Sequence, residues 1–100
     1  MATARVLIAG VWRDAQASGE FHAINPATGE TLPEAFPVSS WADCDKALTA
    51  AAAAAAELRA VGPERLADFL RRFADRLDAH KTELVERAHL ETGLPRAPRL

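Results

Sequence analysis

The spacing of hydrophobic residues changes near position 40, from short apolar runs to a three- and four-residue repeat. The change predicts strands before that point and helices after it. Residues 6–8 and 11–12 are apolar and flank Ala9-Gly10, which predicts a compact hairpin or a bulged strand. The polar stretch 13–20 is expected to be a loop, and residues 21–24 a second short strand.

A turn and a further strand follow. Residues 24–30 read Ile-Asn-Pro-Ala-Thr-Gly-Glu, in which proline fixes φ and Gly29 is free to take positive φ. On the residues alone this stretch is a turn between two strands. Residues 32–38 predict a third strand that is irregular or at a sheet edge, because Pro33 and Pro37 lack the N–H that a strand ladder needs.

Three helices are predicted, over about residues 40–60, 63–79 and 82–92. Ser39 or Ser40 is the expected N-cap of the first, with Asp43 as a weak variant of the capping box. Alanines fill most of its second half and let another backbone approach closely.

The second and third helices have clear start and stop signals. Gly62-Pro63 ends the first helix and begins the second. The second helix has one apolar face, made of Leu66, Phe69, Leu70, Phe73 and Leu77. Gly93 is the expected left-handed residue after the third helix, and Pro95 prevents its continuation.

Composition excludes several classes of function. The formal charge is −2 and the isoelectric point about 5.9, so nothing favours nucleic acid or an anionic membrane as partner. The apolar stretch 6–12 is too short to span a membrane and no leader pattern is present. A single cysteine cannot form an internal disulfide, which favours a reducing compartment. A cytoplasmic location is therefore expected.

No residue predicts catalysis, cofactor binding or metal binding. Cys44 lies in the first turn of a helix but has no neighbouring histidine to act as a base, so a half-buried packing role is favoured. His22, His80 and His89 share no metal-ligand spacing. Glu91 is expected to be a surface residue of the last helical turn. The five glycines are far apart and form neither a dinucleotide fingerprint nor a P-loop.

Several motifs, in order, resemble the N-terminal region of the NAD(P)-dependent aldehyde dehydrogenase superfamily. Residues 7–14 (LIAGVWRD) are similar to its opening strand pair, and residues 24–30 (INPATGE) to its Asn-Pro turn. Residues 43–48 (DCDKAL) and 62–65 (GPER) resemble two of its helix starts. Residues 91–95 (ETGLP) resemble the Glu-Thr-Gly-Lys-Pro that ends its third helix. Leu94 in place of lysine looks more like the branch that oxidises α-ketoglutaric semialdehyde (2,5-dioxovalerate).

The resemblance implies an α/β fold, in which short strands and three helices pack on a Rossmann-like nucleotide-binding domain beyond this chain. It implies NAD or NADP as cofactor, and a cysteine thiolate and a glutamate that lie beyond residue 100. Cys44 falls where the family has a core aliphatic residue. In some members a monovalent cation touches backbone carbonyls just before the Asn-Pro turn, here those of Ala23 and Ile24.

We therefore expect a strand-and-turn segment, 1–38, and a helical segment, 39–100, which together form one incomplete domain. The expected role is structural, within an aldehyde dehydrogenase that assembles as a dimer or tetramer. Residues 1–100 alone are expected to be inactive. The alternative is a stand-alone, non-catalytic module made of a β-hairpin and a helical bundle, which length and composition fit equally well.

Overall fold

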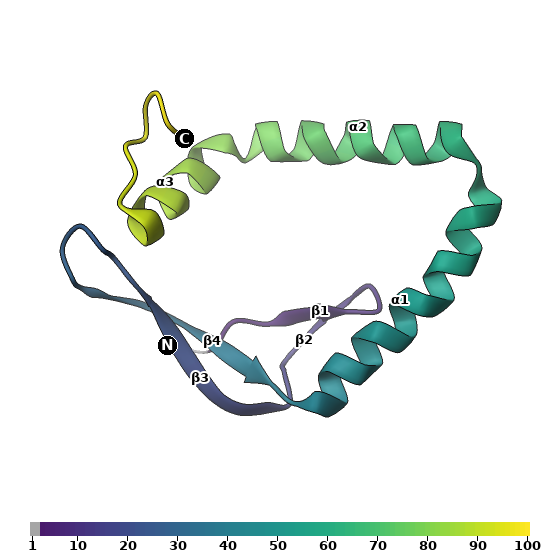
Figure 1. The fold of residues 1–100 in the computed structure, drawn as a ribbon, viewed down its shortest axis with the longest axis horizontal. Coiled ribbons are helices and arrows are strands. Elements are labelled where there is room, and N and C mark those ends of the chain that lie inside the picture. The colour runs from purple at the N-terminus through teal and green to yellow at the C-terminus, as the bar shows by residue number, and fades with distance from the viewer. Residues whose placement is uncertain (1–2) are drawn as a thin grey trace. The chain divides into compact units, whose positions relative to one another are not determined.

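The computed structural model describes residues 3–100, in which short strands precede three helices (Figure 1). This order confirms the predicted fold class. The elements are β1 (Val6–Ile8), β2 (Val11–Arg13), β3 (Ala17–Ile24), β4 (Thr31–Ser39), α1 (Trp41–Val61), α2 (Pro63–Ala79) and α3 (Lys81–Thr92). Each helix begins and ends within one residue of its predicted limits. Serine, glycine and proline mark the start of α1, the junction of α1 with α2 and the end of α3, whereas α2 ends and α3 begins at His80.

Strands β1 and β2 form the expected compact hairpin. They pair antiparallel, with Val6 opposite Arg13 and Ile8 opposite Val11. The turn between them has positive φ at both Ala9 (53°) and Gly10 (79°). Positive φ at both central residues matches the right-handed twist of the flanking strands, so the chain reverses without a bulge.

The predicted loop 13–20 is partly wrong, since β3 begins at Ala17. Residues 17–20 have weak strand propensity, but β3 pairs with β4 in a two-stranded sheet, and Ser18 Oγ donates a hydrogen bond to the Val38 carbonyl (3.3 Å). Pairing with the nine-residue β4 extends the strand where local sequence does not. β4 carries both prolines, and its other edge meets the N-terminal residues at a single bridge, Thr3 to Ala35.

Two compact units make up the chain, and each combines strand and helix segments. One unit contains the residues up to His22 together with Pro33–Ala60, and the other contains Ala23–Leu32 together with Val61–Leu100. This division differs from the expected division of strand from helix content at residue 38. That the segments form one incomplete domain stays a prediction.

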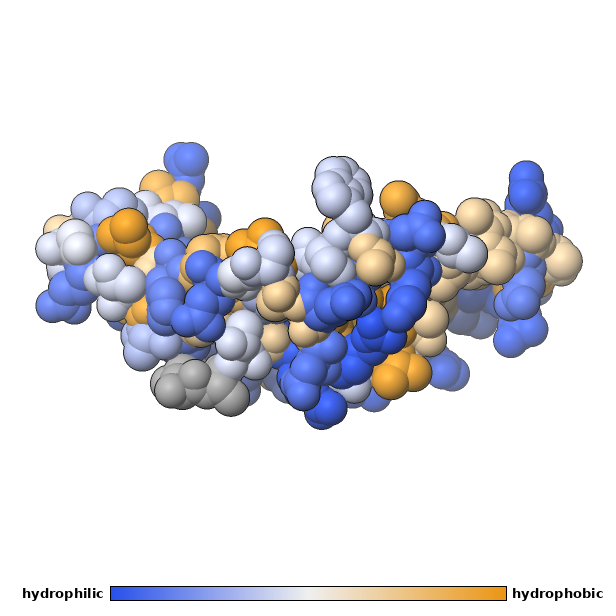
Figure 2. Space-filling view, turned by 90° about the horizontal axis from the view of Figure 1, so that it is seen from below, coloured by the Kyte–Doolittle hydropathy of each residue, from blue (hydrophilic) through white to orange (hydrophobic). Residues whose placement is uncertain are grey.

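The helices bury almost nothing within residues 3–100. In that range the buried hydrophobic residues are Ile8, Leu32 and Ala35, and the only buried residue of the three helices is Asp43. Large apolar side chains are exposed instead, including Trp41, which is 87 % exposed. Figure 2 shows apolar residues at several places among hydrophilic ones on the visible face. Such exposure of large apolar side chains costs free energy in water.

Candidate functional site

The best-organised polar cluster joins the end of β2 to the first turn of α1. Arg13 Nη2 donates a hydrogen bond to Asp43 Oδ1 (2.7 Å), and the backbone N–H of Gln16 donates to Asp43 Oδ2 (2.7 Å). The Asp43 side chain is 1 % exposed, and that of Arg13 is 35 % exposed. Both carboxylate oxygens therefore have strong donors, and neither faces a cavity as a catalytic acid or base would. The cluster is a structural clamp.

Ser40 caps the same helix, which decides between the two predicted N-cap residues. The Asp43 backbone N–H donates to Ser40 Oγ (3.2 Å), and the Ser40 N–H donates to the Gln16 carbonyl (2.8 Å). Only half of the expected capping box forms, because the Asp43 carboxylate is held by Arg13 and cannot reach back to Ser40. Sequence reasoning missed this clamp, since its two ionic partners lie 30 positions apart.

The Asn-Pro turn is closed by its own hydrogen bonds. Asn25 Oδ1 accepts from the Ala27 N–H (3.0 Å), and the Asn25 carbonyl accepts from the Gly29 N–H (2.7 Å). The Asn25 N–H donates to the Glu30 carbonyl (2.8 Å) and so closes the loop. Gly29 has a φ of 77°, which confirms its expected conformation.

This turn also packs on the C-terminus of α3. Gly93 adopts the left-handed conformation, with a φ of 71°, and its N–H donates to the His89 carbonyl (2.9 Å). A β-carbon placed on Gly93 would lie 3.2 Å from Pro26 Cγ. The Asn-Pro turn and the Glu-Thr-Gly segment are therefore in contact, although Pro26 and Gly93 lie 67 positions apart in sequence. The contact lies within one compact unit.

The sequence-predicted candidates are dispersed. Cys44 is half-buried near Trp41 and Ser40. His22 Nε2 lies 4.0 Å from Glu20 Oε1, and His80 Nδ1 lies 3.7 Å from Glu83 Oε2.

The remaining two candidates belong to α3. His89 Nδ1 donates to the Leu94 carbonyl (2.7 Å), which gives this ring a capping role, and Glu91 pairs with Arg87 (3.8 Å). In the described part of the chain, no group of three or more His, Cys, Asp or Glu residues is arranged to hold a metal ion. A cation at the Ala23 and Ile24 carbonyls stays a prediction.

An exposed ion pair fixes the segment after α3. Arg96 donates two hydrogen bonds to Glu86, from Nε (2.6 Å) and from Nη2 (2.9 Å). These hydrogen bonds lower the pKa of Glu86 below its usual 4.5 and raise the pKa of Arg96. The guanidinium of Arg96 and the carboxylate of Glu86 form two parallel hydrogen bonds, and such a bidentate pair has a well-defined geometry.

The Glu86 pairing predicts a pH dependence. Because the folded-state pKa of Glu86 is lowered, its stabilising contribution is present above the usual pKa and is lost as the pH falls through the folded value. An NMR titration of the Glu86 carboxyl should give a midpoint below 4.5. Arg96→Ala should raise that midpoint toward the usual value, whereas Arg99→Ala should leave it unchanged; equal midpoints in all three proteins would contradict the pairing.

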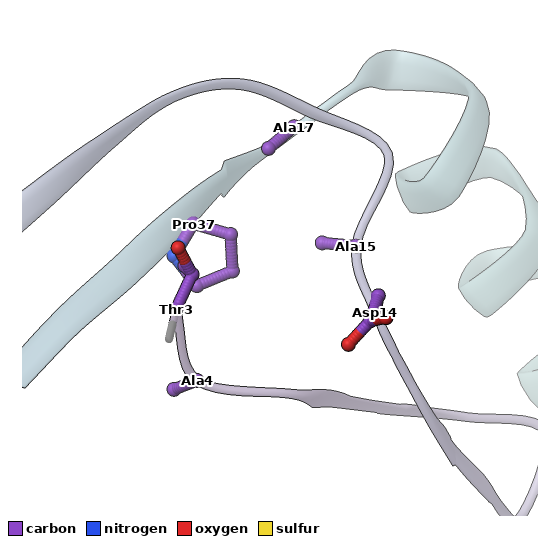
Figure 3. Close-up of a pocket in the computed structure, with 6 residues that line it drawn as sticks. All are labelled: Thr3, Ala4, Asp14, Ala15, Ala17 and Pro37. Atoms are coloured by element: carbon purple, nitrogen blue, oxygen red, sulfur yellow. The ribbon is translucent and has the colours of Figure 1, made fainter. Parts of the chain in front are cut away.

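Two cavities of the first unit, among the described residues, are lined mainly by apolar side chains. One, of about 330 Å³, is lined by Thr3, Ala4, Asp14, Ala15, Ala17 and Pro37 (Figure 3). Its only ionisable side chain, Asp14, is 91 % exposed. A second groove, of about 610 Å³, lies between the β1–β2 hairpin and α1, where Ile8 and Val11 face Ala50 and Ala53. Apolar side chains there suit packing against another surface.

The helix N-termini do not fit the pyrophosphate of a dinucleotide. Such a site needs a glycine-rich turn and a helix N-terminus free of negative charge. Each helix here has an acidic residue in its first turn: Asp43 in α1, Glu64 in α2 and Glu83 in α3. Their carboxylates would repel a phosphate, so we derive no chemical step through NAD or NADP in these residues. In the described part of the chain, no helix is both long and apolar enough to cross a membrane.

Comparison with known proteins decides the family. The model of the aldehyde dehydrogenase family matches residues 12–99. The chain belongs to the aldehyde dehydrogenase family. The clamp, the Asn-Pro turn and the α3 C-terminus all lie within the matched residues.

Curated aldehyde dehydrogenases match over most of this chain. A putative aldehyde dehydrogenase, DhaS, of Bacillus subtilis is 35 % identical over 95 residues, covering 93 % of this chain and 19 % of the relative. Alpha-ketoglutaric semialdehyde dehydrogenase 2 of Azospirillum brasilense is 36 % identical over 89 % of this chain and 17 % of the relative.

A third relative is fluoroacetaldehyde dehydrogenase of Streptantibioticus cattleyicolor, 40 % identical over 88 % of this chain and 17 % of the relative. The chain spans less than a fifth of the length of these relatives. No solved structure matches it significantly.

Proposed function

We propose that this chain is the N-terminal structural segment of an NAD(P)-dependent aldehyde dehydrogenase. The observation that carries the proposal is the family match over residues 12–99, set against relatives that are about five times as long. In this proposal the segment supplies strands and helices to the framework. The nucleotide site, the nucleophilic cysteine and the general base come from the remainder of the enzyme chain, including a Rossmann-like domain.

The exposed apolar residues support the remainder of the chain as the partner. Trp41, Leu48 and Phe69 are each more than 60 % exposed, and α2 and α3 bury no residue. A domain of this size already buries a modest share of its surface, so leaving these residues in water would make it marginal. Packing against the nucleotide-binding domain would cover them.

The finer proposal concerns the reaction. We infer oxidation of α-ketoglutaric semialdehyde to the carboxylate, with NADP or NAD as oxidant, in a cytoplasmic dimer or tetramer. Leu94 followed by Pro95 supports this branch, as does a relative named for that aldehyde. Relatives named for phenylacetaldehyde and malonate semialdehyde have similar identity, so the substrate must be tested on the whole enzyme.

The coding DNA after the codon for Leu100 provides the first test. The proposal predicts an open frame that encodes a strand, a glycine-containing turn and a helix, followed by a cysteine nucleophile. The encoded enzyme should reduce NADP or NAD with α-ketoglutaric semialdehyde, whereas the purified 100-residue chain should not. An in-frame stop would favour the stand-alone module, and NAD(P)H formation by the 100-residue chain would overturn the structural role.

A further inference from the structure

Helix α2 has an apolar face whose side chains are largely exposed. The face consists of Leu66, Phe69, Leu70, Phe73 and Leu77. Leu66 is half-buried, and the other four side chains are between 47 and 63 % exposed. The rings of Phe69 and Phe73 lie 6.2 Å apart between centroids, so they form one continuous surface. We call this surface the α2 apolar face.

Three arginines border this face along one edge. At 3.6 residues per turn, Arg65, Arg72 and Arg76 fall on the same side of the apolar residues. The structure agrees for Arg65 and Arg72, which line a surface depression of about 270 Å³ together with Asp68 and Phe69.

The arginine edge lacks ionic partners. Asp68, which lines the same depression as Arg65 and Arg72, is paired with Arg71 (2.9 Å) on the other side of the helix. Within residues 3–100, no carboxylate pairs with Arg65, Arg72 or Arg76. An exposed apolar face thus lies beside three arginines that form no ion pair among the described residues.

The charge pattern disfavours a lipid surface. Helix α2 carries four acidic and four basic residues, namely Glu64, Asp68, Asp75 and Asp78 against Arg65, Arg71, Arg72 and Arg76. Its net charge is therefore zero, and that of the chain is −2. Helices that lie on anionic membranes depend on a net positive charge on their polar face.

A second copy of α2 packed antiparallel is disfavoured too. When two identical helices pack antiparallel through the same face, each edge meets its own equivalent in the partner. The arginine edges would then oppose each other, and like charges across an interface cost free energy. The opposite edge carries the small residues Ala67 and Ala74, which lets a partner backbone approach closely.

We propose that the α2 apolar face docks on a protein surface that is itself apolar and has carboxylates along one side, where they pair with Arg65, Arg72 and Arg76. The inference rests on the proposed function, because it assigns this surface to the remainder of an aldehyde dehydrogenase chain. It adds the orientation of α2 on that surface: the arginine edge faces the carboxylates, and the alanine edge faces away from them.

The test uses a complete enzyme in which this chain replaces the equivalent N-terminal segment of the Bacillus subtilis aldehyde dehydrogenase DhaS, which is 35 % identical. Two charge reversals at adjacent positions are compared. Arg72→Glu reverses an arginine on the bordering edge, and Arg71→Glu reverses the arginine paired with Asp68 on the other side. Arg72→Gln removes the same charge without reversing it.

We expect Arg72→Glu to lower the midpoint of thermal unfolding of the chimera by several degrees, Arg72→Gln to lower it less, and Arg71→Glu to change it little. High salt should narrow the difference between the Arg72 variants and the parent. Circular dichroism of the 100-residue chain should show that neither reversal unfolds α2 itself, because both arginines are exposed.

Each other outcome overturns the inference in a distinguishable way. Equal midpoints for Arg72→Glu and Arg71→Glu in a soluble chimera would reject the arginine edge and leave the proposed function intact. An insoluble parent chimera would reject the proposed function itself, and this inference with it. Binding of the 100-residue chain to phosphatidylserine vesicles, or a dimer of that chain insensitive to Arg72→Glu, would assign the face to lipid or to a second copy.

Discussion

Replacing Asp43 by alanine should destabilise the first compact unit by about 3 kcal/mol, the scale for removing one partner of a buried, hydrogen-bonded ion pair. The substitution leaves the Gln16 N–H without its acceptor and Arg13 without its counter-charge. It also removes a carboxylate from the first turn of α1, where the helix dipole favours negative charge. The Arg13 side chain is one third exposed, so water recovers part of the loss.

Tryptophan fluorescence gives a direct reading of this effect. The chain has two tryptophans, Trp12 and Trp41, and both belong to the unit that contains the clamp. Urea unfolding followed at these residues should shift to a lower denaturant concentration in Asp43→Ala. Asp14→Ala removes an exposed ion pair with Arg5 in the same unit and serves as the control, with an expected change of less than about 0.5 kcal/mol.

The double variant separates pairing from burial. Arg13→Ala alone leaves a buried carboxylate with only the Gln16 N–H as donor, so it should also be strongly destabilising. The variant with both substitutions should lose less than the sum of the two single losses, because no uncompensated charge remains. Strict additivity, or an unfolding curve of Asp43→Ala that overlays the parent, would show that the pair does not clamp the unit.

Local signals account for what the sequence predicts well. The β1–β2 hairpin follows from two apolar runs around Ala9-Gly10. Helix α2 begins at Pro63, and its apolar repeat ends at Leu77, shortly before the C-cap residue His80. These features need only neighbours within a few positions. The start of β3 was mispredicted because residues 17–20 become a strand through pairing with β4, which no local pattern reports.

The same reasoning explains what the sequence conceals about the clamp. Ser40 and Asp43 have the spacing of a helix cap, and the cap forms. The burial of the Asp43 carboxylate depends on Arg13 and Gln16, which precede it by 30 and 27 positions. The sequence does not distinguish a buried aspartate from a solvated one. Only the tertiary contacts distinguish the clamp from an ordinary surface residue at a helix start.

The Asn-Pro turn and the Glu-Thr-Gly segment present a similar case. Each is predicted separately, one as a turn with Gly29 at positive φ and the other as a helix end at Gly93. Their contact through Pro26 is visible only in the fold. Gly93 is therefore constrained both by its positive φ and by its contact with Pro26, whereas Gly29 is constrained by its positive φ alone.

This difference predicts unequal costs for the same substitution. Gly29→Ala meets open space but must hold alanine at a φ of 77°, which should cost about 1 kcal/mol. Gly93→Ala has a similar backbone cost at a φ of 71°, and its β-carbon would also lie 3.2 Å from Pro26 Cγ and 3.6 Å from the Ala27 nitrogen. The hydrogen bonds that close the turn limit how far Pro26 can move. We therefore expect about 2 kcal/mol or more for Gly93→Ala.

Amide hydrogen exchange can resolve the two effects, because both glycines lie in the unit that lacks tryptophan. Gly93→Ala should speed exchange both in α3 and at the Gly29 N–H of the turn, since it disturbs the surface between them. Gly29→Ala should act mainly on the turn. Gly19→Ala, at a glycine with open space and no positive φ, should change neither. If Gly93→Ala left the turn amides as protected as in the parent, the turn would not depend on α3. The contact between the Asn-Pro turn and the Glu-Thr-Gly segment would then not stabilise the unit to which both belong.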